Sequence, residues 1–128
     1  MRKTAWNNMI NHCRSELPNE ACGLISGING YQEKVWEISN VNKSPYSFEM
    51  DSVQVEAIFN YFNRKKETVT GIYHSHPTAD PFPSLEDVEN IIYPEIPYFI
   101  VSFKTNKPDV KGYLINGNKI VQLHIRLY

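Results

Sequence analysis

Two kinds of hydrophobic spacing run along the chain, and each predicts its own kind of secondary structure. Apolar residues at steps of three and four predict helices over residues 6–17 and 51–65. A shorter helix is predicted to begin at Ser84 and to end before Pro94. Alternating or continuous apolar runs predict six strands, at residues 21–28, 31–38, 68–76, 98–103, 110–115 and 119–127.

Several ends and faces of these elements are also predicted by local signals. Asn-Gly pairs lie between consecutive predicted strands at 29–30 and 116–117, which indicates two-residue hairpin turns. Asp51 followed by Gln54 is a capping pair for the second helix. His12 falls on the polar side of the first helix, where we expect it to be solvated.

The composition fits one small domain over residues 1–128 and excludes several classes of function. A chain of 128 residues can bury roughly two-thirds of its unfolded surface, and no repeat, linker or low-complexity tract divides it. A net charge of −1 argues against a surface for nucleic acid or anionic membrane. No apolar run follows the basic N-terminal residues or reaches transmembrane length, so we expect neither a signal peptide nor a membrane span.

The two cysteines, Cys13 and Cys22, are too few for a disulfide framework, so we expect reduced thiols in a cytoplasmic protein. Cys22 follows Glu20 by two residues and could be pictured as a metal ligand. It alternates within an apolar strand, however, which favours packing as a small hydrophobic side chain. Most glutamates beside a proline turn are surface residues, and composition alone predicts the same for Glu20.

The stretch from His74 to Asp87 carries the candidate chemistry. His74 and His76 end a predicted strand, so their side chains share one face about 7 Å apart along the strand. Pro77 turns the chain away, and a stiff proline-containing loop returns it to Ser84, which opens the next helix with Asp87 in its first turn. Two imidazoles and one carboxylate make a three-ligand zinc site, which leaves a position for water.

Simpler interpretations of the same residues stay open. A His-x-His pair on an exposed strand face is usually just solvated. Ser84, with Asp87 three residues later, is also a good helix start without any metal. The conjunction favours the metal site, because the strand end, the stiff loop and the helix start bring all the ligands to one point. Ser84 can do both, capping through one lone pair and facing the site with its hydroxyl.

The spacing His-Ser-His-Pro, six residues, Ser, two residues, Asp resembles the signature of the JAMM (MPN-plus) metalloproteases. Glu20, in the run NEACGL, matches the upstream glutamate of that family. The resemblance covers nearly the whole chain and implies an α/β fold, a mixed β-sheet flanked by helices that is related to the cytidine-deaminase fold. It implies one Zn2+ per chain on His74, His76 and Asp87, with Glu20 as general base and Ser84 stabilising the oxyanion.

Among members of that family, the chain is more similar to the small bacterial ones, which process the glycine-rich tail of sulfur-carrier proteins with a ubiquitin-like fold. The short loop over residues 78–83 leaves little room for the insertions with which larger members grip ubiquitin. The implied reaction is hydrolysis of a peptide or isopeptide bond at the tail of a small ubiquitin-like or sulfur-carrier protein. The sequence leaves the oligomeric state open.

Two other classes of protein are weighed against this one. A non-catalytic MPN-type scaffold is the alternative within the family, although such relatives lack one or more ligands and all five positions are filled here. A nucleoside deaminase has a related fold and also activates water on zinc, but it uses a Cys-x-x-Cys motif. This chain has no such motif, which argues strongly against deamination.

Overall fold

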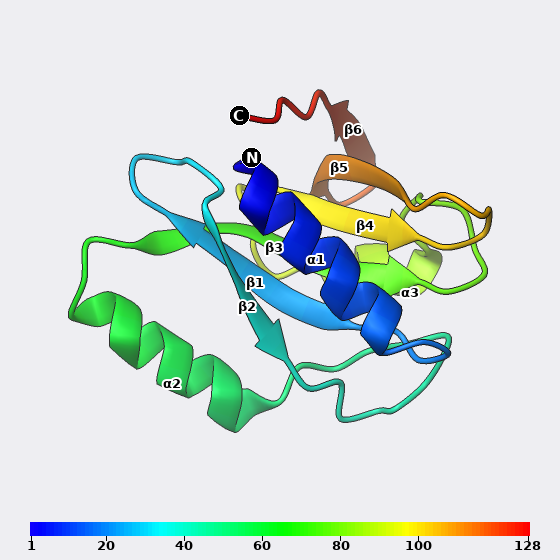
Figure 1. Cartoon of the computed structure of the whole chain (residues 1–128), viewed down its shortest axis with the longest axis horizontal. Helices are drawn as coiled ribbons and strands as arrows, with labels where there is room; N and C mark the ends of the chain where they lie inside the picture. The colour runs from blue at the N-terminus through cyan, green and yellow to red at the C-terminus, as the bar shows by residue number, and fades with distance from the viewer.

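Six strands form one mixed sheet with helices packed on its faces (Figure 1). The computed structural model describes residues 1–128. The strand order is β2-β1-β3-β4-β5-β6, and β3 and β4 run parallel whereas the other neighbours are antiparallel. This confirms the predicted α/β fold and all of its elements, which are α1 (Lys3–Ser15), β1 (Cys22–Gly27), β2 (Lys34–Ile38), α2 (Ser52–Asn63), β3 (Thr68–His76), α3 (Leu85–Glu89), β4 (Tyr98–Ser102), β5 (Asp109–Asn116) and β6 (Lys119–Leu123).

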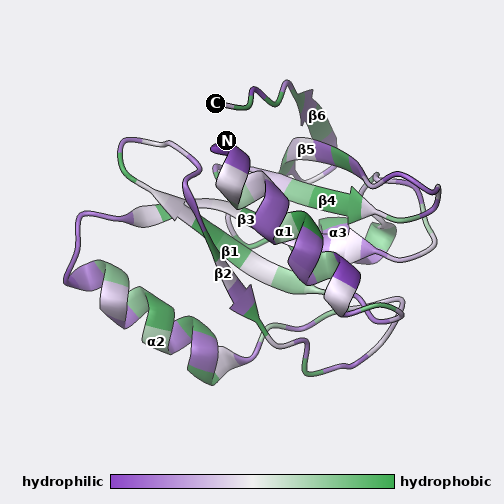
Figure 2. Ribbon diagram, in the orientation of Figure 1, coloured by the Kyte–Doolittle hydropathy of each residue, from purple (hydrophilic) through white to green (hydrophobic).

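One face of the sheet packs against α1, which crosses in front of β1 and β3 in Figure 1. Met9 and Cys13 of this helix pack with Tyr73 and Phe99 of the sheet in one buried cluster. Every residue of β1 and β4 is buried, and Figure 2 shows the apolar residues of these strands. Both strands are therefore covered on both faces, which is typical of continuous apolar runs.

The opposite face is covered by α2, α3 and loop segments rather than by one long helix. Leu24 and Ile72 belong to the buried cluster on this side, and Val55 and Phe59 of α2 pack against it while staying partly exposed. Phe62 is the only residue of α2 that is buried. In Figure 1 this helix lies toward the β2 edge of the sheet. The incomplete cover leaves part of this face accessible beside β3.

The first hairpin differs from its predicted form. Asn29 and Gly30 adopt positive φ angles of 57° and 82°, as a tight turn at this pair requires. The strand pairing nevertheless begins only at Lys34, opposite Ser26, and the Tyr31 carbonyl lies close against Gly27. The connection is thus longer than the two residues that the sequence predicts.

The second hairpin and the start of α2 form close to their predicted places. The two turn residues of the second hairpin are Gly117 and Asn118, one position later than predicted. Asp51 caps α2 as predicted, and its side chain accepts the backbone N–H of Gln54. Gln54 does not complete a capping box, because its own side chain bonds the backbone and hydroxyl of Ser39.

His12 is buried, which corrects the prediction of a solvated side chain. Only 5% of the residue is exposed, and its Nδ1 lies 2.6 Å from the Tyr73 hydroxyl oxygen. Burial lowers the pKa of His12, although the nearby carboxylates of Glu37 and Glu16 act to raise it. The buried tyrosine hydroxyl needs a partner, and that partner is a residue 61 positions away, which helical spacing alone cannot reveal.

Several elements also end before their predicted positions. The first helix stops at Ser15 and leaves Leu17 exposed, the helix after Ser84 stops at Glu89, and the last strand stops at Leu123. Two residues of the predicted apolar stripe after Ser84, namely Leu85 and Ile92, are 77% and 74% exposed. None of the helices combines the length and apolar character that crossing a membrane demands.

Replacing Gly23 by alanine should destabilise the fold, because a Cβ at this position would overlap the ring of Tyr73. Tyr73 is fully buried and bonded to His12, so it has no room to move aside. We expect the free energy of unfolding to fall by about 1–3 kcal/mol, measured by urea denaturation. Gly30→Asn is the control, since Gly30 has open space and a positive φ that asparagine tolerates. An equal loss in both variants would contradict overpacking as the cause.

Candidate metal centre

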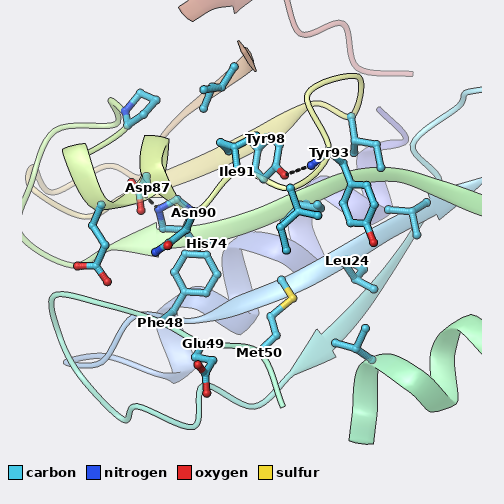
Figure 3. Close-up of a pocket in the computed structure, with 18 of the residues that line it drawn as sticks. Leu24, Phe48, Glu49, Met50, His74, Asp87, Asn90, Ile91, Tyr93 and Tyr98 are labelled. Atoms are coloured by element: carbon cyan, nitrogen blue, oxygen red, sulfur yellow. Dashed lines mark hydrogen bonds and ion pairs between the residues drawn. The ribbon is translucent and has the colours of Figure 1, made fainter. Parts of the chain in front are cut away.

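The three predicted ligands converge at the end of β3. His74 and His76 project from alternate positions of this strand, and Asp87 lies in α3, whose helix begins after the N-cap Ser84. The Nε2 atoms of the two histidines lie 3.1 Å apart, and each lies 3.1 Å from Oδ2 of Asp87. Figure 3 shows His74 and Asp87 side by side, with Phe48 next to His74. The structure therefore brings together residues 13 and 11 positions apart as one compact triangle.

The hydrogen bonding of His76 directs a lone pair into this triangle. Its Nδ1 lies 2.8 Å from the carbonyl oxygen of Asp80, an acceptor, so Nδ1 carries the hydrogen and donates it. The Nε2 of neutral His76 then has an unshared electron pair that faces Nε2 of His74 and the carboxylate of Asp87. Fixing the tautomer through the other ring nitrogen is typical of histidines that ligate metals. The loop carbonyl was not predicted, because no side chain signals it.

The donor set fits a zinc ion. Ligands at bonds of about 2.0–2.1 Å in a tetrahedron lie about 3.3–3.4 Å apart, close to the 3.1 Å edges seen here. His74 and His76 are buried and Asp87 is half-buried, so solvent competes little for these atoms. The Nδ1 of His74 is buried without a hydrogen-bond partner, and its ring stacks on Phe48 with centroids 4.6 Å apart. Three protein ligands leave one position of a tetrahedron open.

The electrostatics of the triangle favour a cation. Burial by itself would raise the pKa of Asp87, but the contacts with His74 and His76 outweigh it and hold that pKa well below its usual range. Burial acts to lower the pKa of His76, whereas Asp87 and the Asp80 carbonyl raise it more strongly, so the net shift is upward. Positive charge is thus stabilised between these groups, and a divalent cation carries more of it than a proton does.

Ser84 and Asp87 form the predicted capping box. The Asp87 N–H donates to Oγ of Ser84 over 3.0 Å, and the Ser84 N–H donates to Oδ2 of Asp87 over 2.9 Å. Oδ2 of Asp87 is the same oxygen that faces the histidines. The capping and ligand interpretations are therefore compatible, because the helix start holds the carboxylate in place for the site. The Ser84 hydroxyl accepts with its oxygen and keeps its hydrogen available to donate.

Glu20 is buried beside the triangle, which corrects the surface position predicted from composition. Only 5% of the residue is exposed, and its Oε1 atom has no hydrogen-bond partner. Burial raises the pKa of Glu20 to about 8, while the charge of His76 lowers it and that of Asp87 raises it. A cation on the three ligands would oppose the effect of burial and favour the carboxylate. Nothing in the local sequence indicates this burial.

Cys22 and His124 are not part of the site. The Cys22 thiol is fully buried and donates weakly to the Ile38 carbonyl oxygen over 3.5 Å. Burial raises the pKa of Cys22 to about 12, so the thiolate that binds metal is disfavoured. His124 is exposed, beyond the end of β6. The buried thiol agrees with the interpretation of Cys22 from sequence.

A groove of about 860 Å³ opens at His74 and Asp87 and follows the sheet face that α2 leaves incompletely covered (Figure 3). Its floor is apolar and includes Leu24, Ile72 and Ile100. Its lining contains no lysine or arginine, but several acidic residues, which are Glu49, Glu56, Glu86, Asp87 and Glu89. The sequence did not predict this groove, because its walls come from separate loops and helices.

The family model described as prokaryotic homologs of the JAB domain matches residues 2–114. A CysO-cysteine peptidase of Mycobacterium tuberculosis is 30% identical over 125 residues, which cover 95% of this chain and 86% of the relative. A desampylase of Haloferax volcanii is 30% identical over 105 residues, which cover 77% and 76% of the two chains. The chain therefore belongs to the prokaryotic JAB-domain branch of the JAMM/MPN family, and it is a hydrolase.

Solved structures agree with this assignment. The solution structure of DSY2949 from Desulfitobacterium hafniense superimposes with a TM-score of 0.89 at 32% identity, covering 100% of this chain and 93% of that one. The crystal structure of AF2198, a JAB1/MPN domain protein from Archaeoglobus fulgidus, has a TM-score of 0.66 at 18% identity, covering 98% and 95%. The second likeness shows the shared fold alone.

We expect the purified protein to bind a divalent metal through the triangle, and His74→Ala or His76→Ala to lose most of it. Each substitution removes one of the three ligands, and the two that remain are too few to hold the metal tightly. Metal content per chain, measured by elemental analysis after dialysis, tests this. His124→Ala is the matched control, since that histidine is exposed and remote from the ligands. Full metal retention in both ligand variants would rule out this site.

Proposed function

We propose that the chain is a zinc-dependent peptidase that hydrolyses a peptide or isopeptide bond at the C-terminal tail of a small ubiquitin-like or sulfur-carrier protein. The observation that carries the proposal is the triangle of 3.1 Å edges between His74, His76 and Asp87, with the unpartnered carboxylate of Glu20 buried beside it. These residues would hold one zinc ion. The proposed catalytic unit comprises residues 1–128 as a single domain.

Zinc, when bound, supplies Lewis-acid chemistry that lowers the pKa of a water in its open position to about 7. The proposed task of Glu20 is to accept the proton of that water and to return it to the leaving amine. Its carboxylate suits this role because Oε1 makes no other hydrogen bond. Burial raises its pKa and the charge of His76 lowers it, and the net pKa of about 8 falls in a range where a proton can be both taken and released.

Ser84 is proposed to stabilise the negative charge that develops on the substrate carbonyl oxygen. Its Oγ is occupied as an acceptor of the Asp87 N–H, so the hydroxyl hydrogen remains as the donor. A donor aimed at such an oxygen typically contributes about 3 kcal/mol to the stability of the transition state. The capping box holds Ser84 and the ligand Asp87 in one rigid turn, so donor and ligand keep a fixed relation.

The proposed substrate class rests on the relatives and on the groove. The relatives named CysO-cysteine peptidase and desampylase support cleavage at the tails of sulfur-carrier or ubiquitin-like proteins. The groove begins at His74 and Asp87, so an extended tail lying in it would bring its last peptide group to the ligands. The loop over residues 78–83 is short, which leaves the entrance free for a folded carrier domain.

Glu20→Gln should separate binding from chemistry. Glutamine keeps the size of the side chain but cannot accept a proton, so we expect metal content and fold to be retained. Hydrolysis should fall by at least about 100-fold, the usual scale for loss of a general base. Turnover measured together with metal content tests this, with Glu37→Gln as control, because Glu37 is exposed and remote from the ligands. Near wild-type turnover would mean that another group is the base.

Incubation with candidate substrates tests the reaction itself. Sulfur-carrier and ubiquitin-like proteins, each with a cysteine, peptide or lysine-linked adduct on its C-terminus, are mixed with the metal-loaded protein and read by intact mass. We expect at least one adduct to lose the group beyond its terminal glycine, and a chelator to abolish the loss. Full metal loading without cleavage of any adduct would contradict the proposed function and favour a non-catalytic scaffold.

A further inference from the structure

The place of Glu20 in the site is set by its backbone. Its Oε1 atom makes no hydrogen bond that could hold the carboxylate in one position. Glu20 also lies outside the β-ladder, because β1 begins at Cys22, which is the first residue of that strand paired with β3. Something other than regular sheet pairing must therefore fix the Glu20 segment beside the metal ligands.

Ser75, the residue between the two histidines, makes that connection. Its backbone N–H donates to the Ala21 carbonyl oxygen over 3.1 Å, as a ladder bond would. The Ala21 N–H donates to Oγ of Ser75 over 2.8 Å, rather than to the Ser75 carbonyl oxygen. The hydroxyl thus takes the place of a backbone acceptor. The strand next to Glu20 is held to β3 by one side chain at the position where regular pairing ends.

The location of Ser75 makes this contact rigid. Ser75 is fully buried, and strand alternation turns its side chain to the sheet face opposite His74 and His76. Cys13 of α1, also fully buried, lies near its hydroxyl. A displacement of Ser75 would therefore move the two histidines with it. One residue of β3 links the strand that carries two ligands to the segment that carries the proposed base.

The other side of Glu20 is anchored by Asn40. The Asn40 Nδ2 donates to the Glu20 carbonyl oxygen over 3.0 Å, and the Glu20 N–H donates to the Ser44 carbonyl oxygen over 2.8 Å. Asn40 is itself held within its own loop, where Oδ1 accepts two backbone N–H groups, those of Asn42 and Glu49. Both polar groups of the Glu20 backbone are thus bonded to the loop after β2.

We propose that Ser75 is a positioning residue, which sets the distance between the Glu20 carboxylate and the metal ligands through its two hydrogen bonds to Ala21, with Asn40 as the second anchor. The proposal rests on the proposed function in that Glu20 is the base. A displacement of about 1 Å in a catalytic group can cost about 100-fold in rate. Loss of the hydrogen bonds between Ser75 and Ala21 should therefore have a measurable effect on the rate. The Ser75 side chain lies on the sheet face opposite His74 and His76, so it is not proposed to contact the metal or the substrate.

The first measurement compares Ser75→Ala with Ser75→Thr. Alanine removes the acceptor for the Ala21 N–H, whereas threonine keeps a hydroxyl and suits a strand. We expect Ser75→Ala to bind metal fully and to keep its KM, while kcat falls about 10- to 100-fold, and threonine to restore most of the loss. Ser26→Ala is the matched control, because Ser26 is a fully buried serine at the far end of the same strand pair. It should keep kcat.

The second measurement reads the position of Glu20 without activity. In protein loaded with cobalt(II), a paramagnetic ion that adopts zinc-like coordination, the relaxation of a 13C-labelled Glu20 carboxyl falls with the sixth power of its distance from the metal. We expect Ser75→Ala to change this relaxation severalfold. The relaxation of the His74 and His76 rings should stay unchanged. Asn40→Asp loses the donor to the Glu20 carbonyl oxygen but keeps Oδ1 as an acceptor. It should therefore also change the relaxation of the Glu20 carboxyl. This variant is measured in place of Ser75→Ala if Ser75→Ala does not fold.

The outcomes separate this proposal from the proposed function. Wild-type protein that binds metal but cleaves no adduct contradicts the function. Even then, the relaxation of the Glu20 carboxyl in the cobalt-loaded protein still tests the role of Ser75. Unchanged relaxation in Asn40→Asp would overturn the second anchor. Unchanged relaxation in a folded Ser75→Ala would overturn the positioning role of Ser75. So would a kcat in Ser75→Ala equal to that of the active wild type, or a kcat loss in Ser26→Ala as large as that in Ser75→Ala.

Discussion

Three electron-pair donors held at 3.1 Å from one another are the constraint on which the rest of this structure depends. Without a proton or a cation among them, the lone pairs of His74, His76 and Asp87 repel one another. Each is nevertheless fixed by something else: the histidines by a buried strand and Asp87 by its capping box. The folded chain thus maintains an arrangement that is unfavourable until a proton or a cation occupies it, which suits a metal centre.

The sheet explains how so short a chain builds this centre. β3 pairs with β1 on one side and runs parallel to β4 on the other, so its end is buried from both sides and cannot fray. One strand therefore carries two ligands, with Ser75 between them bonded to the segment of Glu20. α3 needs only five residues, because its task is to present Asp87 and Ser84 at a fixed angle to that strand end. The sparse cover on the same face forms the groove that leads there.

Predictions from local sequence were correct where the structure depends only on residues a few positions apart. The N-cap of α2, the strand that ends at His76 and the capping box at Ser84 depend on neighbours a few residues away, and the structure has them as predicted. One prediction that depended on a distant partner was wrong. His12 was expected in solvent but pairs with a tyrosine hydroxyl of β3, and spacing within one helix contains no information about that partner. The longer first hairpin and the one-residue shift of the second turn have a similar origin, because strand register is set by packing across the sheet.

The sequence by itself predicted the elements, their order and the three candidate ligands that the structure brings together, because alternation, proline placement and capping are properties of adjacent residues. Tertiary structure alone decided that Glu20 is buried with an unpartnered oxygen, that Ser75 fastens the segment beside it, and that a groove opens at His74. These features join segments about 20 to 55 residues apart, such as Glu20 with Asn40 and Ala21 with Ser75. Burial depends on what the whole chain packs around a position, and no local pattern of polar and apolar residues specifies that.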